Sequence, residues 1–164
     1  MPATYDSIAS TTLGSSTGTV SFSSIVGTYT DLAVVITGTA SANYGLWFRV
    51  NDDSGTNYSY TGLYGTGSST VSDRASNNSF GFIAGNISTS QSISITHFLN
   101  YSNTTTNKTV ISRGNDSAQG VNAGVSLWRS TSAINKITFA PGTSFPTGTF
   151  ASGTTFTLFG IKAA

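Results

Sequence analysis

The chain lacks glutamate and cysteine altogether, and only 8% of its 164 residues are charged. Glutamate and lysine are favourable in helices, so their scarcity disfavours a helical fold. Without cysteine, disulfides cannot contribute to stability and mixed Cys/His zinc sites are excluded. The one histidine, His97, excludes a three-histidine site and stands in an alternating stretch typical of a packed or surface strand residue.

Clustered charge and long apolar runs are missing as well. No apolar stretch approaches the roughly 18 residues that span a membrane, and the N-terminal MPATYDSIAS does not have the pattern of a signal peptide. Seven Lys and Arg residues are scattered singly, and the net charge is +1. We therefore expect neither a nucleic-acid-binding face nor a membrane-binding patch. A near-neutral surface lacks charge repulsion between copies, which indicates a protein that lives in an assembly.

Carboxylates are too few and too poorly placed to predict an enzyme. Glycoside hydrolysis usually needs two carboxylates that flank the scissile bond. Every aspartate lies in or near a turn-like context; they are Asp6, Asp31, Asp52, Asp53, Asp73 and Asp116. Asn51-Asp52-Asp53 lacks the spaced oxygen ligands of a calcium-binding loop and is better explained as a turn. We expect no catalytic site, no cofactor and no bound metal.

What the chain does contain predicts an all-β fold. About a third of its residues are serine or threonine, and ten Phe, seven Tyr and two Trp supply a core. Strand-like runs separated by Gly, Asn, Ser and Asp clusters occur at 19–25, 31–37, 44–50, 79–84, 92–100, 108–113, 121–129, 134–139 and 154–161. The strongly apolar last run is expected inside a sheet.

These runs predict a jelly-roll-like β-sandwich of about eight to ten antiparallel strands with an N-terminal arm, rather than an up-and-down barrel. Residues 1–18 would be the arm or a first edge strand, and residues 19–164 a single sandwich domain. Residues 56–78 are the least regular stretch, which we interpret as a wandering strand that seals one end of the sandwich or as a binding loop.

Aromatic residues are the remaining candidates for contacts. Tyr58, Tyr60 and Tyr64 cluster in the irregular stretch, where they are candidate interface or glycan contacts. Trp128 is a further candidate. Both Trp47 and Trp128 alternate with apolar neighbours, and for each of them a core position in the sandwich is the favoured interpretation.

Several segments resemble a family of small virion proteins of tailed bacteriophages, notably phages of cyanobacteria and other aquatic bacteria. The sharpest are WRST-x-AI-x-x-I (Trp128 to Ile137) and the ending GTTFTLFGIKAA; NYSYTGLYGTGSST and NYSNTTTNKTVISRGN add to them. The resemblance covers nearly the whole chain. It implies a β-sandwich on the virion surface, as a trimer, and brings no catalytic residues.

Three functions follow as hypotheses. The first is a non-enzymatic capsid decoration (cement) protein, a homotrimer made in the host cytoplasm that contacts the major capsid protein or another virion protein. The second is a receptor-binding tail-fibre or head-fibre module that recognises a host surface glycan. The third is a small glycan-cleaving enzyme, which the carboxylate shortage disfavours. The absence of a collagen-like or coiled-coil stem favours the first.

Overall fold

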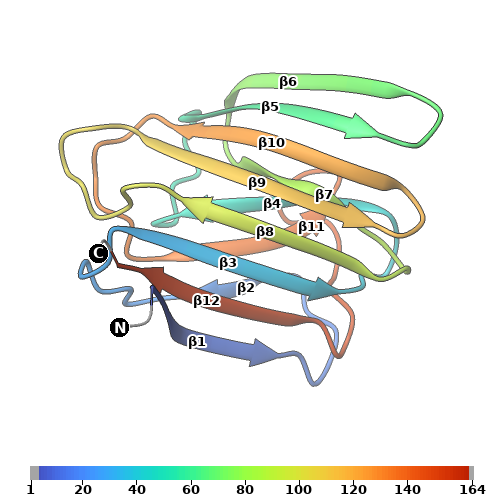
Figure 1. The fold of residues 1–164 in the computed structure, drawn as a ribbon, viewed down its shortest axis with the longest axis horizontal. Coiled ribbons are helices and arrows are strands. Elements are labelled where there is room, and N and C mark those ends of the chain that lie inside the picture. Colours follow the sequence, from blue (N-terminus) through green and yellow to red (C-terminus); the bar gives the residue numbers. More distant parts are fainter. Residues whose placement is uncertain (1–3, 163–164) are drawn as a thin grey trace.

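The computed structural model describes residues 4–162, which form twelve antiparallel strands and no helix (Figure 1). The strands are β1 (Tyr5–Thr12), β2 (Val20–Phe22), β3 (Asp31–Gly38), β4 (Tyr44–Val50), β5 (Tyr58–Gly65), β6 (Thr70–Asn78), β7 (Gly81–Ile87), β8 (Ser92–Phe98), β9 (Lys108–Asp116), β10 (Gly120–Trp128), β11 (Ile137–Gly142) and β12 (Thr155–Ile161). The all-β prediction is confirmed, although the strands are more numerous than the expected eight to ten.

The strands form two sheets that pack face to face as a sandwich. The larger sheet has eight strands in the order β1-β12-β3-β8-β9-β10-β5-β6, and the smaller has four in the order β2-β11-β4-β7. Figure 1 shows the larger sheet in front of the smaller one, with the β5–β6 hairpin at one end and β1 at the other. The last strand, β12, lies between β1 and β3, which confirms its predicted position inside a sheet.

Eight of the strands have jelly-roll connectivity. Pairing joins β1 to β12, β2 to β11, β3 to β8 and β4 to β7, so the chain is a long hairpin rolled up on itself. Successive pairs fall alternately in the two sheets, as in a double-sheet jelly roll. The other four strands, β5, β6, β9 and β10, are inserted hairpins that extend the larger sheet beyond this framework.

The additional strands come from two segments that carry little hydrophobic patterning. Residues 5–12 form the edge strand β1, paired with β12, and these residues lie in the segment interpreted as an arm or first edge strand. Residues 58–78 form the β5–β6 hairpin at an edge of the larger sheet, with one irregularity between Tyr58 and Tyr60. The stretch is therefore strand, in agreement with the first of its two interpretations, although it extends the sheet instead of sealing an end of the sandwich; the alternative of a loop is wrong. Gly62 lies in mid-strand, where the absence of a side chain leaves room for the Phe82 ring.

The core lies between the jelly-roll strands of the two sheets. Leu46, Phe48 and Val50 of β4 point inward and are at most 2% exposed, as the alternation of that strand predicts. The Phe48 ring meets that of Phe98, from the opposite sheet, edge-on with 5.2 Å between centroids. Aromatic packing of this kind fixes the sandwich without disulfides.

The free edge of the smaller sheet is covered by hydroxyl groups of the larger one. β7 presents unpaired backbone groups, and the serine triplet, defined here as Ser94 of β8, Ser112 of β9 and Ser126 of β10, contacts them. Ser126 Oγ accepts from Phe82 N at 3.0 Å and donates to Phe82 O at 2.9 Å. Ser112 Oγ accepts from Ala84 N at 2.7 Å, and Ser94 Oγ donates to Ala84 O at 2.8 Å. An edge strand is thereby protected from pairing with other chains.

Candidate functional site

The inserted strands turn their apolar residues toward solvent. In β10, Val121 and Val125 are 63% and 49% exposed, whereas Ser126 and Trp128 on the opposite face are buried. The residues of β10 alternate between two faces, as the sequence indicates, but the apolar face is the one exposed to solvent. Its orientation follows from the serine triplet, because small polar residues must face inward to reach the edge of β7.

Exposed apolar side chains are concentrated on this end of the larger sheet. Of the eight large apolar residues that are exposed within residues 4–162, six lie on β5, β6, β8, β9 and β10. Five of them share the outward side, which we call the apolar outer face: Leu63, Ile93, Ile111, Val121 and Val125. Exposed apolar patches on soluble proteins usually mark a surface that binds another molecule.

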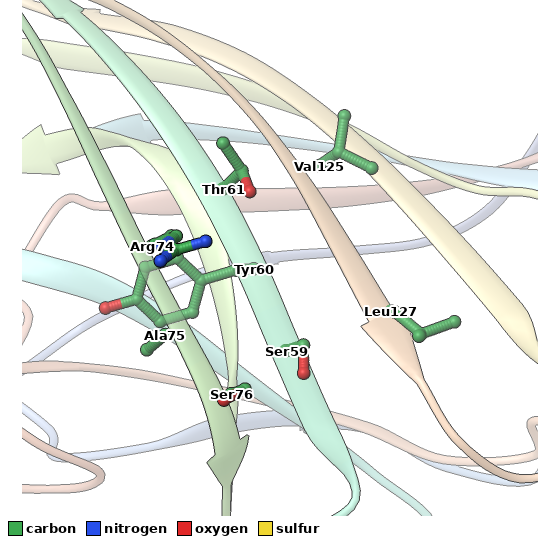
Figure 2. A pocket seen from close by; sticks show the side chains of 8 residues that line it. All are labelled: Ser59, Tyr60, Thr61, Arg74, Ala75, Ser76, Val125 and Leu127. Carbon is green, nitrogen blue, oxygen red and sulfur yellow. The ribbon is translucent and has the colours of Figure 1, made fainter.

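Shallow depressions lie over the same strands. One, of about 710 Å³, is lined by residues of β5, β6 and β10. Figure 2 shows Val125 and Leu127 projecting from β10 beside Ser59 and Thr61 of β5, while the ring of Tyr60 extends toward β6 and away from them. Two further depressions, of about 550 and 180 Å³, lie over β5 and β10 and include Leu63, Val121 and Val125 among their lining residues.

The charges on the apolar outer face are positive. Arg113 lies across from Ile95 and Ala123, and Arg74 across from Thr61. Within residues 4–162, no carboxylate forms an ion pair with either arginine, whereas Lys136 and Lys162 pair with Asp52 and Asp6 elsewhere. A guanidinium among apolar side chains is a strong binding site for an incoming carboxylate.

The other side of the β5–β6 hairpin carries the two candidate tyrosines that remain accessible. We call this side the hairpin underside and define it by Tyr60, Tyr64, Val71 and Asp73. The Tyr60 and Tyr64 rings are half-buried against Phe82, with 5.2 Å and 5.9 Å between ring centroids. Val71 is 55% exposed, because β6 packs on β5 and not on the smaller sheet.

Burial and the Asp73 carboxylate both oppose ionisation of these tyrosines. They raise the pKa of Tyr60 above the ordinary 10.0 and that of Tyr64 to about 12. Burial also raises the pKa of Tyr58, in the core. The phenols of Tyr60 and Tyr64 therefore stay protonated to a higher pH than an exposed tyrosine does.

This arrangement predicts loss of stability in alkali. A tyrosine with a raised pKa in the folded state ionises first in the unfolded state, near its ordinary value of 10.0. Stability is then fully present below pH 10 and falls as the pH rises from 10 toward 12. We expect tyrosinate absorbance and loss of β-sheet circular dichroism to rise together in that window. Ionisation of these tyrosines near pH 10 with the fold intact would contradict the shift.

The structure separates the four candidate residues into two pairs. Tyr60 and Tyr64 are together on the hairpin underside, whereas Tyr58 and Trp128 are 0% and 3% exposed and belong to the core. The prediction that Tyr58 and Trp128 contact a partner is therefore wrong, because their side chains are buried and cannot reach one. The favoured core position of Trp128 is confirmed.

Tyr58 and Trp128 instead fix the turn that precedes β5. Trp128 Nε1 donates to Asp53 Oδ2 at 2.6 Å, and the Tyr58 hydroxyl donates to Asp53 O at 3.2 Å. Burial alone would raise the pKa of Asp53, but hydrogen bonds from Trp128, Asn57 and Gly55 outweigh it and lower the pKa. The turn prediction for this segment is confirmed, with φ of 51° at Asn51 and 57° at Asp52.

The one histidine of the chain, His97, is half-buried in mid-strand. His97 lies on the outward side of β8 across from Ile111, and burial with the neighbouring Arg113 lowers its pKa. In the described part of the chain, no three His, Cys, Asp or Glu residues are grouped so that they could hold a metal ion. Residues 4–162 also include no helix that could cross a membrane.

Comparison with known proteins places the chain in no family. No protein-family model matches it, and no curated protein sequence does. Among solved structures, an exo-inulinase from Aspergillus awamori aligns with 96% of this chain and 29% of its own, at 11% identity and a TM-score of 0.35. A functionally unknown Saccharomyces cerevisiae protein aligns with 74% of this chain and 69% of its own, at 8% identity and a TM-score of 0.26.

A third similar structure is the VP2 protein of infectious bursal disease virus. It aligns with 96% of this chain and 35% of its own, at 14% identity and a TM-score of 0.10. Scores this low carry no functional conclusion for any of the three. The functional proposal therefore depends on the chain's own surfaces and on its sequence segments.

Proposed function

We propose that the chain is a non-enzymatic structural protein of a tailed-phage particle, a decoration protein that acts as a homotrimer on the virion surface. The observation that carries this proposal is the apolar outer face. A permanently exposed apolar face is costly in water, and an assembly covers it. The resemblance of the sequence to small virion proteins suggests that this assembly is a phage particle. Besides its own copies, the protein would then contact the major capsid protein or another virion protein.

The fold suits such a role. An aromatic core holds the two sheets together without disulfides, and the jelly-roll framework presents broad sheet faces. Hydroxyl groups cover much of the exterior, so the protein is hydrated without a large net charge.

Copy number in purified particles tests the proposal. Quantitative mass spectrometry of virions that carry this protein should find it in numbers comparable to the major capsid protein, and electron microscopy should locate it on the capsid. A protein absent from particles, or present only in the few copies of a fibre, would contradict a decoration role.

One observation favours a second candidate function, the recognition of a host glycan. Tyr60 and Tyr64 are half-buried rings beside the exposed carboxylate of Asp73, and such rings stack on sugars while carboxylates accept their hydroxyls. Glycan-array binding that disappears in the Tyr60→Ala/Tyr64→Ala variant would establish this function. Equal array signals for both proteins, or none for either, would dismiss it.

A further inference from the structure

Two surfaces of this chain are complementary to each other. The apolar outer face has positive charges only, Arg113 and Arg74, and Arg113 lies among its exposed valine, leucine and isoleucine side chains. The hairpin underside has one negative charge, Asp73, beside the exposed Val71 and the two tyrosine rings. Each surface is therefore apolar with charge of one sign, and the two signs are opposite.

Neither Arg113 nor Asp73 is neutralised within its own copy. In residues 4–162 no carboxylate pairs with Arg113, and no cation pairs with Asp73, whose carboxylate accepts from the backbone N of Arg74 at 2.7 Å. By contrast, Lys136 and Asp52, away from these surfaces, form an ion pair at 2.8 Å. Charges surrounded by apolar groups are stabilised when a partner of opposite sign is supplied from outside.

The two surfaces are placed so that they cannot meet within one molecule. They lie on opposite sides of the larger sheet, and β6 extends past the smaller sheet, so the underside is open below the hairpin. A second copy can place its apolar outer face in that space. Stacking two apolar outer faces on each other would place arginines of both copies in one interface without a carboxylate to pair with them.

We infer that the hairpin underside of one copy binds the apolar outer face of the next, with Asp73 paired to Arg113 of the neighbouring copy. This inference rests on the proposed homotrimer and identifies its interface. Because two different surfaces meet, the contact is heterologous, and a ring of three copies closes it. Each copy thereby covers the exposed apolar residues of its neighbour.

Valine-to-aspartate variants of the full chain test the inference. Light scattering of the native protein should give three times the 16.9 kDa chain mass. Val125→Asp on the apolar outer face and Val71→Asp on the underside should each give the single-chain mass, because a carboxylate is buried in the contact. Val26→Asp is the matched control: Val26 is 55% exposed, like Val71, but lies between β2 and β3, and its variant should stay trimeric.

Charge reversal tests the pairing itself. Asp73→Arg and Arg113→Asp should each weaken association by about tenfold or more, as expected when one member of a close interfacial pair is reversed. The double variant should recover association, since the pair is restored in the opposite sense. Circular dichroism should show that all variants retain β-sheet content, which separates dissociation from unfolding.

The possible outcomes distinguish the inference from the proposed function. A native trimer that survives Val71→Asp, Val125→Asp and both reversals overturns the inference and leaves the trimeric decoration protein standing. A native monomer at all concentrations overturns both the interface and the trimer. Dissociation by the face variants with rescue by the double reversal supports the inference even if virions contain few copies.

Discussion

Replacing Phe82 with alanine is expected to lower the free energy of unfolding by about 3–5 kcal/mol, the usual cost of removing a buried phenylalanine ring. Phe82 is 2% exposed, and Trp47, Tyr60 and Tyr64 surround it with centroid distances of 5.2–5.9 Å. Added Cβ atoms at Gly62 and Gly124 would come within 3.1 Å and 2.7 Å of the ring, so those glycines leave the space that it occupies.

The same substitution should loosen the β5–β6 hairpin before the rest of the sandwich. Hydrogen exchange should accelerate in β5 and β6 more than in β3 or β12, because the Phe82 ring packs against both Tyr60 and Tyr64 of the hairpin. Urea unfolding at one fixed protein concentration measures the stability loss. Phe159→Ala, at a half-buried ring on β12, is the control and should cost less. Equal losses from the two variants would contradict this role of Phe82.

Removing two hydroxyl groups, in the variant Ser112→Ala/Ser126→Ala, is expected to cost about 2–6 kcal/mol, at about 1–3 kcal/mol for each of the two buried backbone N–H groups left unpaired. The hydroxyls accept from Ala84 N and Phe82 N, and both serines are at most 2% exposed. Water has little access to replace them there. The edge of β7 would lose its cover, so we also expect aggregation on heating.

Ser10→Ala is the matched control for the double variant. The Ser10 hydroxyl is exposed and bonds only to Thr157 Oγ1, at 3.1 Å, so water replaces it and stability should change little. Thermal and urea unfolding of the three proteins measure the difference. A double variant as stable as Ser10→Ala would show that the serine triplet does not support β7.

Much of the fold follows from local sequence patterns. Leu46, Phe48 and Val50 alternate with less apolar residues, and the structure buries all three, because in a jelly-roll strand the apolar side faces the core. The strongly apolar β12 lies inside the sheet, and Asn51 and Asp52 form the turn that their side chains favour. In each case a short-range preference and the global fold agree.

The candidate site was only partly predictable. The cluster of aromatic residues in the sequence identifies Tyr60 and Tyr64 as candidates. Their neighbours Val71 and Asp73 lie in a stretch without strong patterning, and this stretch is a strand only because it pairs with β5. Val125, Ile111 and Arg113 were missed, although the signal is present. In β10 the valines alternate with Gly124 and Ser126, residues too small for an ordinary core face.

The all-β class, the supply of aromatic residues for a core and the shortage of catalytic groups can all be read from the sequence, because they depend on composition and on the two-residue period of strands. The strand order of the jelly roll and the side of the inserted strands that meets water depend on long-range pairing and packing, so they become visible only in the folded molecule. Alternation tells which residues share a face but not which face is covered. Here the serine triplet reaches the backbone of β7, so the polar side is buried and Val121 and Val125 are left outside.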